Sequence, residues 1–186
     1  RLCVRRLAES VKQPCSLNRL SNLIKATGTP CSPSTVMEYV RYLQESCLLI
    51  SIDNYVSKFV EKETIKKHYF VDNGLLHLFI NNPNTSLLEN LCAITLYKKY
   101  AKGLYYYNKN IEVDFYVPDE GLAVQASYQM SDGETIEREV KALVALHGLH
   151  PLKRAMIITY EDEGEIVRDG LRIEIKPAWK WVLEGL

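Results

Sequence analysis

The order in which helical and strand-like segments follow one another constrains the fold of this chain more than any single motif. Three segments near the N-terminus, at residues 2–11, 16–26 and 34–45, carry apolar residues at helical spacing and end at turn or breaker residues. Two β-like runs follow at residues 49–52 and 68–71, with a polar, lysine-rich stretch between them. The pattern predicts three helices and then a hairpin with a charged tip. The third helix is expected to bury Val36, Tyr39, Val40 and Leu43 against the other two.

This order of elements is typical of a winged helix, whose third helix can enter the major groove of DNA. Winged helices also dock on other proteins. Only one strongly basic residue, Arg41, lies in the third helix, so DNA contact and a structural or interdomain role both remain open. If DNA binds, the lysines of the hairpin are expected to face its phosphates. The candidates for nucleic-acid binding are Arg41, Lys58, Lys62, Lys66 and Lys67.

Beyond residue 82 the pattern changes to alternating helices and strands, which predicts an α/β fold. An Asn-Asn-Pro-Asn turn at residues 81–84 separates the two patterns. We therefore expect an N-terminal winged-helix domain at residues 1–82 and an α/β domain at residues 83–186. The elements expected in the second domain are helices at residues 86–102 and 133–146, strands at residues 104–107, 111–117, 123–128, 155–160 and 171–175, and a closing segment at residues 179–183.

Composition and charge narrow the class of protein further. Hydrophobic residues make up 47% of the chain and charged residues 25%, which suits a folded protein rather than a disordered tail. The chain has no apolar run that could span a membrane, no signal peptide and no Cys-x-x-Cys pair among its five cysteines. We expect a cytoplasmic protein with reduced thiols and no membrane partner. Residues 1–70 carry 11 Lys and Arg against 6 Asp and Glu, which weakly favours a polyanion as partner of this half.

Several short segments, taken in order, carry a resemblance to a known family. Residues 67–75 read KHYFVDNGL, residues 88–91 read LENL, residues 111–115 read IEVDF, residues 124–127 read VQAS and residues 134–139 read ETIERE. Together they resemble the C-terminal region of a family of bacterial and archaeal AAA-type ATPases. That region combines a winged helix with a restriction-endonuclease-like domain of the PD-(D/E)XK type. The resemblance implies the restriction-endonuclease-like fold for residues 83–186.

The resemblance also implies a set of site residues. In the nuclease template, a helical Glu, a strand Asp and the first residue of an (E/Q)-x-K pair share a divalent cation such as Mg²⁺, and Glu89, Asp114 and Gln125 match these positions. Ser127 stands where the template has Lys, so the fixed positive charge beside the attacked phosphate is missing. Three further residues are expected to support the site. Glu112 lies on the same strand face as Asp114, and Arg138 or Lys141 is expected to supply a replacement cation.

The function expected from these features is that of an accessory region of an AAA-type ATPase, with a binding or regulatory role and a degenerate nuclease-like site. The residues contain no P-loop motif, so ATP binding is assigned to an upstream domain of a longer chain. Two alternatives remain open: a metal-dependent nuclease with an altered motif, and a DNA-binding regulator. The chain is thus expected to be inactive as an enzyme, or else to be a Mg²⁺-dependent phosphodiesterase. Aromatic residues 105–107, Trp179 and Trp181 are explained by core packing rather than by base stacking. Neither the substrate nor the oligomeric state follows from the sequence.

Overall fold

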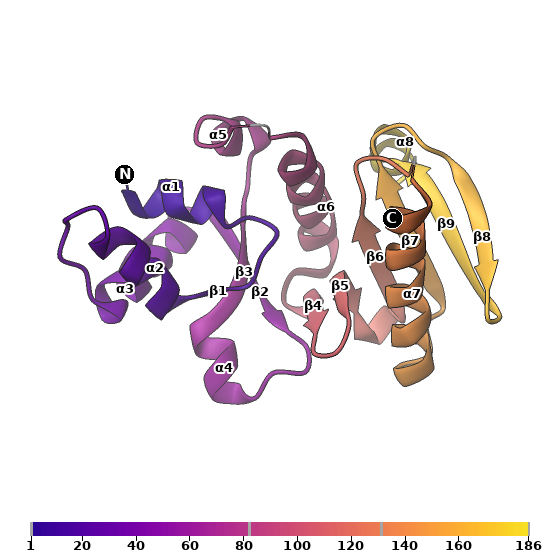
Figure 1. The fold of residues 1–186 in the computed structure, drawn as a ribbon, viewed down its shortest axis with the longest axis horizontal. Coiled ribbons are helices and arrows are strands. Elements are labelled where there is room, and N and C mark those ends of the chain that lie inside the picture. Colours follow the sequence, from indigo (N-terminus) through magenta and orange to yellow (C-terminus); the bar gives the residue numbers. More distant parts are fainter. Residues whose placement is uncertain (1, 82, 131, 186) are drawn as a thin grey trace.

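The computed structural model describes residues 2–81, 83–130 and 132–185. It is a mixed α/β fold in which the strands of the described residues form one nine-stranded sheet, in the order β1-β3-β2-β4-β5-β6-β7-β9-β8. Helix α6 lies in the middle of the molecule, between the part that carries α1 to α4 and the part that carries β6 to β9 (Figure 1). Among the described residues, none of the helices combines the length and the apolar character needed to cross a membrane.

The N-terminal part contains three helices that pack together beside a small antiparallel ladder. Ser16 and Ser32 begin α2 and α3, because each side chain accepts a hydrogen bond from a backbone N–H three residues later. Val36 and Val40 are buried as expected, but the prediction for Tyr39 was wrong: this side chain is 48% exposed. The elements are α1 (Leu2–Glu9), β1 (Cys15–Ser16), α2 (Leu17–Lys25), α3 (Pro33–Glu45), β2 (Leu49–Asn54), α4 (Phe59–Thr64) and β3 (Ile65–Phe70).

Strands from both sides of the predicted domain boundary belong to one sheet. The next elements are α5 (Asn73–His77), α6 (Asn84–Tyr100), β4 (Tyr105–Asn108) and β5 (Glu112–Val117). Strand β2 pairs with β4 in parallel, through Asp53 with Tyr105 and Asn54 with Tyr106. Helix α6 contacts β3 and β2 of the first part and β5 and β6 of the second. Asn82, the last residue of the predicted first domain, lies outside the described residues, and the division of the chain into two domains stays a prediction.

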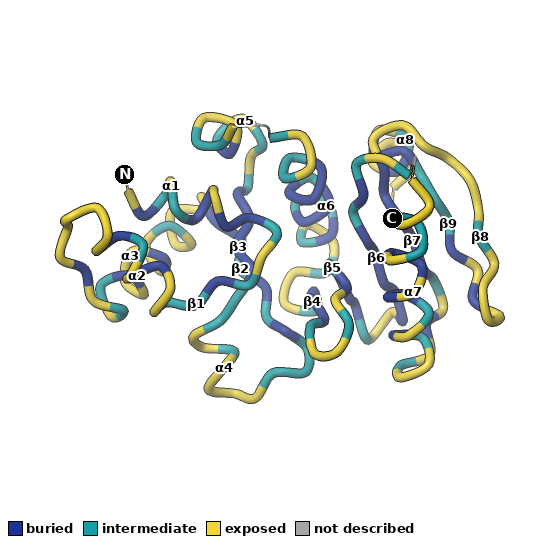
Figure 2. The backbone as a smooth tube through the Cα atoms, viewed as in Figure 1, coloured by how far each residue is buried: buried dark blue, intermediate teal, exposed yellow. Residues whose placement is uncertain are grey.

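The C-terminal part is a parallel ladder with helices on both faces. Strand β7 pairs in parallel with β6 and with β9, whereas the edge strand β8, which the sequence did not predict, pairs antiparallel with β9. Helices α6 and α8 cover one face of this ladder and α7 covers the other. Figure 2 shows β7 buried along its length and β8 exposed at the edge. The elements are β6 (Leu122–Ala126), α7 (Gly133–Leu149), β7 (Arg154–Thr159), β8 (Gly164–Arg168), β9 (Leu171–Pro177) and α8 (Ala178–Glu184).

Candidate functional site

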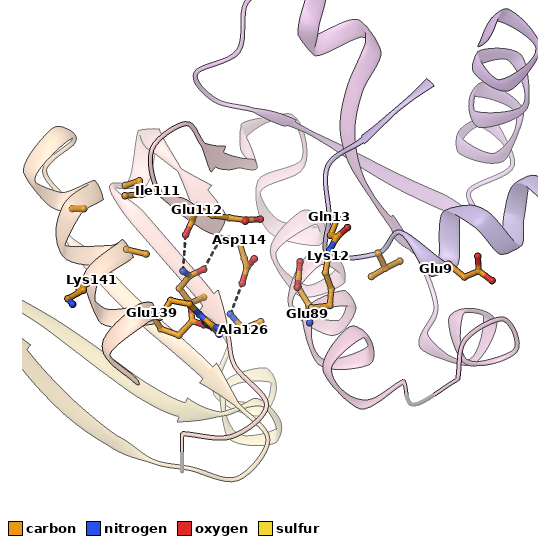
Figure 3. Close-up of a pocket in the computed structure, with 15 residues that line it drawn as sticks. Glu9, Lys12, Gln13, Glu89, Ile111, Glu112, Asp114, Ala126, Glu139 and Lys141 are labelled. Carbon is orange, nitrogen blue, oxygen red and sulfur yellow. Dashed lines mark hydrogen bonds and ion pairs between the residues drawn. The ribbon is translucent and has the colours of Figure 1, made fainter. Parts of the chain in front are cut away.

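A cavity of about 930 Å³ opens between the loop that follows α1 and the elements β5, β6 and α7. In Figure 3, Lys12 and Gln13 of this loop lie next to Glu89 of α6, and Glu112, Asp114 and Glu139 line the opposite wall. The backbone of Lys12 has a φ of 86°, a conformation that residues with a Cβ atom rarely adopt. The side chain of Lys12 donates a hydrogen bond to Thr85 Oγ1 at 3.2 Å, which holds the loop against the first turn of α6.

A buried lysine lies at the centre of the carboxylates of this cavity. Lys67 Nζ lies 3.0 Å from Asp114 Oδ1, 3.3 Å from Glu112 Oε1 and 3.4 Å from Glu89 Oε1. The side chain of Lys67 is 0% exposed and that of Glu89 is 2% exposed, whereas Glu112 is half exposed. Tyr69 Oη donates a further hydrogen bond to Glu89 Oε1 at 2.8 Å. Lys67 and Tyr69 are two residues apart on β3, so both side chains leave the strand on the same face, toward α6.

Burial and charge act together on the protonation of this cluster. Burial alone would lower the pKa of Lys67, but the carboxylates of Asp114, Glu89 and Glu112 outweigh it and raise the pKa well above its usual value. The pKa of Glu89 is raised to about 7, chiefly by burial and then by the charge of Asp114, although Lys67 and Tyr69 counteract part of the shift. Lys67 therefore stays charged at neutral pH, while Glu89 is poised between its protonated and ionised forms.

Asp114 and Gln125 connect β5 to β6 by a reciprocal exchange of hydrogen bonds. Gln125 Oε1 accepts from the Asp114 N–H at 2.8 Å, and Gln125 Nε2 donates to the Glu112 carbonyl at 3.1 Å. In return, Asp114 Oδ2 accepts from the Ala126 N–H at 3.1 Å. The antiparallel pairs of the two strands begin only at Phe115, so these side chains supply the backbone bonds where the strands separate. Both ends of the Gln125 amide are thereby used to hold the sheet together.

Of the three other residues proposed for the site, two line the cavity and one does not. Ser127 is buried, does not line the cavity and donates to the carbonyl of Gln129 at 3.2 Å. Arg138 and Lys141 line the cavity from α7, but both are 71% exposed. Arg138 pairs with Glu139 at 2.6 Å, and Lys141 lies 3.4 Å from a carboxylate oxygen of the preceding turn. The cation inside the carboxylate cluster is thus Lys67, which the sequence had placed elsewhere.

The residues present do not fit a divalent cation. Hard cations such as Mg²⁺ need several free oxygen ligands, but Asp114 uses one oxygen for Lys67 and the other for Ala126 N–H. The amide oxygen of Gln125 is also occupied. Within residues 2–81, 83–130 and 132–185, no group of three or more His, Cys, Asp or Glu side chains is placed to hold a metal ion. The ammonium group of Lys67 already lies among the carboxylates that the template gives to the metal and balances part of their charge, and it would repel a second cation at this distance.

The candidate nucleic-acid residues differ in their exposure and in their partners. Lys58 is exposed, and Lys62 lies over the ring of Tyr105, 5.5 Å from its centroid. Arg41 lies 3.6 Å from Glu45, and Lys66 pairs with Asp53 at 2.7 Å. The expectation that Lys67 faces phosphate with them is wrong in position, because this side chain is completely buried. Part of the expected charged tip also forms the helix α4.

Sequence reasoning missed the pairing of Lys67 with the carboxylates of Glu89 and Asp114, and it missed the place of Lys12. A signal for the first was present, since Lys67 lies two residues before Tyr69 in a strand whose other residues are mostly apolar or aromatic. A lysine on the buried face of a strand requires a buried carboxylate as partner. The sequence contains no such signal for Lys12, whose position depends on how the loop after α1 crosses the cavity.

Comparison with known proteins yields one distant relative. An uncharacterized protein of Methanocaldococcus jannaschii, MJ1544, is 31% identical to this chain over 183 residues. The match covers 90% of this chain and 40% of the relative, so the chain spans about two fifths of that protein's length. No protein-family model matches the chain, and no solved structure matches it significantly.

Proposed function

We propose that this chain is an accessory, non-hydrolytic region of an AAA-type ATPase, with a winged-helix part and a PD-(D/E)XK nuclease-like part, and that it binds or regulates rather than cleaves. One observation carries the proposal: the ammonium group of Lys67 lies within 3.4 Å of all three carboxylates that the nuclease template would use or support. In this cluster a lysine lies among the carboxylates, whereas in a PD-(D/E)XK nuclease such carboxylates hold a metal ion.

Two further observations support the loss of hydrolysis. A hydrolytic lysine must reach the attacked phosphate, but Lys67 is completely buried, and Ser127 at the template position carries no charge. Loss of one preorganised charged group typically costs about 2–4 kcal/mol of barrier, roughly a hundred- to a thousand-fold in rate. The Gln125 amide, the remaining template ligand, holds backbone groups of β5.

The alternative of a DNA-binding regulator receives less support from the surface of α3. Its exposed face carries Met37, Tyr39 and Tyr42, each about half exposed. The charged residues of this helix are Glu38, Arg41 and Glu45, and Arg41 is paired with Glu45. An apolar face with a slight negative charge is better suited to a protein surface than to the phosphates of DNA.

A cleavage assay tests the absence of hydrolysis. Wild-type protein would be incubated with single- and double-stranded DNA and RNA in Mg²⁺ or Mn²⁺, beside Asp114→Asn and the matched control Asp119→Asn, an exposed acid in the turn before β6. We expect no metal-dependent cleavage by any of them. Cleavage by wild type and by Asp119→Asn that disappears in a folded Asp114→Asn protein would overturn the proposal. Ser127→Lys is not expected to restore activity, because residue 127 does not line the cavity.

The association with an ATPase has a separate test. The gene that encodes this chain should encode a Gly-x-x-x-x-Gly-Lys-Ser/Thr motif upstream of Arg1, and the longer protein should hydrolyse ATP. An upstream region without this motif would contradict that part of the proposal and leave the non-hydrolytic site unaffected.

A further inference from the structure

A second pocket, of about 470 Å³, lies at the carboxyl ends of three adjacent parallel strands. Strand β6 ends at Ala126, β7 at Thr159 and β9 at Pro177. In open α/β sheets, ligands bind preferentially in the crevice outside this edge. The floor of the pocket is apolar and comes from α6, through Leu87, Leu88 and Leu91.

Each of the three strands delivers one aromatic ring to the pocket. Tyr128 follows β6, Tyr160 follows β7 and Trp179 follows β9. The rings of Tyr128 and Tyr160 stack at 4.9 Å between centroids and 16° between planes, and the Tyr160 N–H donates to the Tyr128 carbonyl. Tyr160 is 51% exposed and Trp179 is 61% exposed, in contrast to the fully buried Trp181. Core packing therefore does not explain Tyr160 and Trp179, although it does explain Trp181.

The segment that follows Tyr160 and enters β8 is strongly acidic. Residues 161–165 read EDEGE and contain no Lys or Arg. Three of the four carboxylates have partners: Asp162 accepts from the Met130 N–H, Glu163 pairs with Lys180 and Glu165 pairs with Arg172. Glu161 is exposed and lines the pocket with the aromatic rings. The pocket thus combines exposed aromatic rings, an apolar floor and a carboxylate.

From this combination we infer that the pocket binds an arginine side chain of a basic segment in a partner protein. A guanidinium group is planar and cationic, so it stacks on the faces of Tyr and Trp and donates two parallel hydrogen bonds to a carboxylate. The methylene stem of arginine is apolar and suits the leucines of α6. The exposed carboxylate of Glu161 complements the positive charge of the guanidinium group. This site lies apart from Lys67 and does not depend on the proposed function.

Titration with a matched pair of peptides tests the inference. The probes are Ac-Gly-Arg-Leu-Arg-Gly-NH₂ and the same peptide with citrulline, the neutral isostere, in place of arginine. Trp179 reports binding by its fluorescence, because the only other tryptophan, Trp181, is buried. We expect the arginine peptide to bind about tenfold tighter than the citrulline peptide.

Variants distinguish this pocket from general charge attraction. Glu161→Gln keeps the shape of the side chain and should weaken the arginine peptide about tenfold, and Tyr160→Leu should weaken it by a similar factor in calorimetry. Glu120→Gln makes the same change of charge before β6, at the opposite end of that strand, and should leave the affinity unchanged.

Three results would overturn the inference. Equal binding of the citrulline peptide would remove the role of the guanidinium charge. Binding of N-acetyl-arginine amide as tight as that of the peptide would point to a small guanidinium compound instead of a partner protein. Binding of AMP or oligo-dT in place of the arginine peptide would assign the aromatic rings to a nucleobase and the first turn of α6, which also borders the pocket, to a phosphate.

Discussion

Two cavities lie against α6, and they differ in how their charges are balanced. In the first, the buried carboxylate of Glu89 and the partly buried carboxylate of Asp114 face the ammonium group of Lys67. In the second, Glu161 is exposed beside aromatic rings. A buried carboxylate requires an internal partner in the folded protein, whereas an exposed carboxylate is stabilised by water and stays free for a ligand. The first cavity is therefore a closed structural network, and the second is open for recognition.

The largest effect should come from removing the internal cation. Lys67→Met leaves the buried Glu89 and the partly buried Asp114 without this counter-charge, and we expect a loss of about 3–5 kcal/mol of unfolding free energy. Urea denaturation measures this. Lys66→Met, in the preceding position of β3, removes a partly exposed lysine paired with Asp53 and should cost about 1 kcal/mol or less. Similar losses in both variants would contradict the closed network.

The pH dependence should be the next largest effect. The pKa of Glu89 is raised to about 7 in the folded protein from 4.5 as its ordinary value. Between these values the folded state binds more protons than the unfolded state, so the contribution of Glu89 to stability is full below about pH 4.5 and is lost as pH rises to 7. Against Glu89→Gln, wild type should lose about 1.4 kcal/mol per pH unit in the middle of this window. A difference that does not change with pH would show that Glu89 is an ordinary ionised group.

Removal of the tyrosine hydroxyl should have a moderate effect. Tyr69→Phe deletes the donor to Glu89 Oε1 and leaves a buried carboxylate with one partner fewer. We expect a loss of about 1–3 kcal/mol in thermal or urea unfolding, together with a further rise in the pKa of Glu89. Tyr105→Phe, in a partly exposed position on β4, is the matched control and should change stability by less than about 0.5 kcal/mol. An unchanged midpoint for Tyr69→Phe would mean that the hydrogen bond does not contribute.

The smallest effect on stability is expected in the second cavity. Glu161→Gln alters an exposed side chain, so the unfolding free energy should change by less than about 0.5 kcal/mol even though binding of the arginine peptide weakens. Parallel thermal unfolding and peptide titration of the same preparation compare the two quantities. A loss of stability comparable to that of Tyr69→Phe would assign Glu161 to the structure and remove the contrast between the cavities.

Much of the fold follows from local patterns in the sequence. Helices α2, α3 and α7 begin within two residues of their predicted starts, because a serine or aspartate cap and an apolar period of 3.6 act over short distances. Strand alternation likewise put Glu112 and Asp114 on one face, and both approach Lys67. Strand β8 was missed because it lies at the edge of the sheet and buries no residue.

The sequence alone thus determined which residues are helical or extended and which acidic positions share a strand face, since these properties depend on neighbours in the chain. Only the tertiary structure decided which cation meets the acids. Lys67 belongs to β3, which β2 and β4 separate from β5 in the sheet, and it reaches Asp114 because α6 and the sheet bring residues 67, 89 and 114 together. The same holds for Tyr128, Tyr160 and Trp179, which meet only because three strands run in parallel and end at one edge. Such contacts depend on long-range packing, which the local periodicity of apolar residues does not predict.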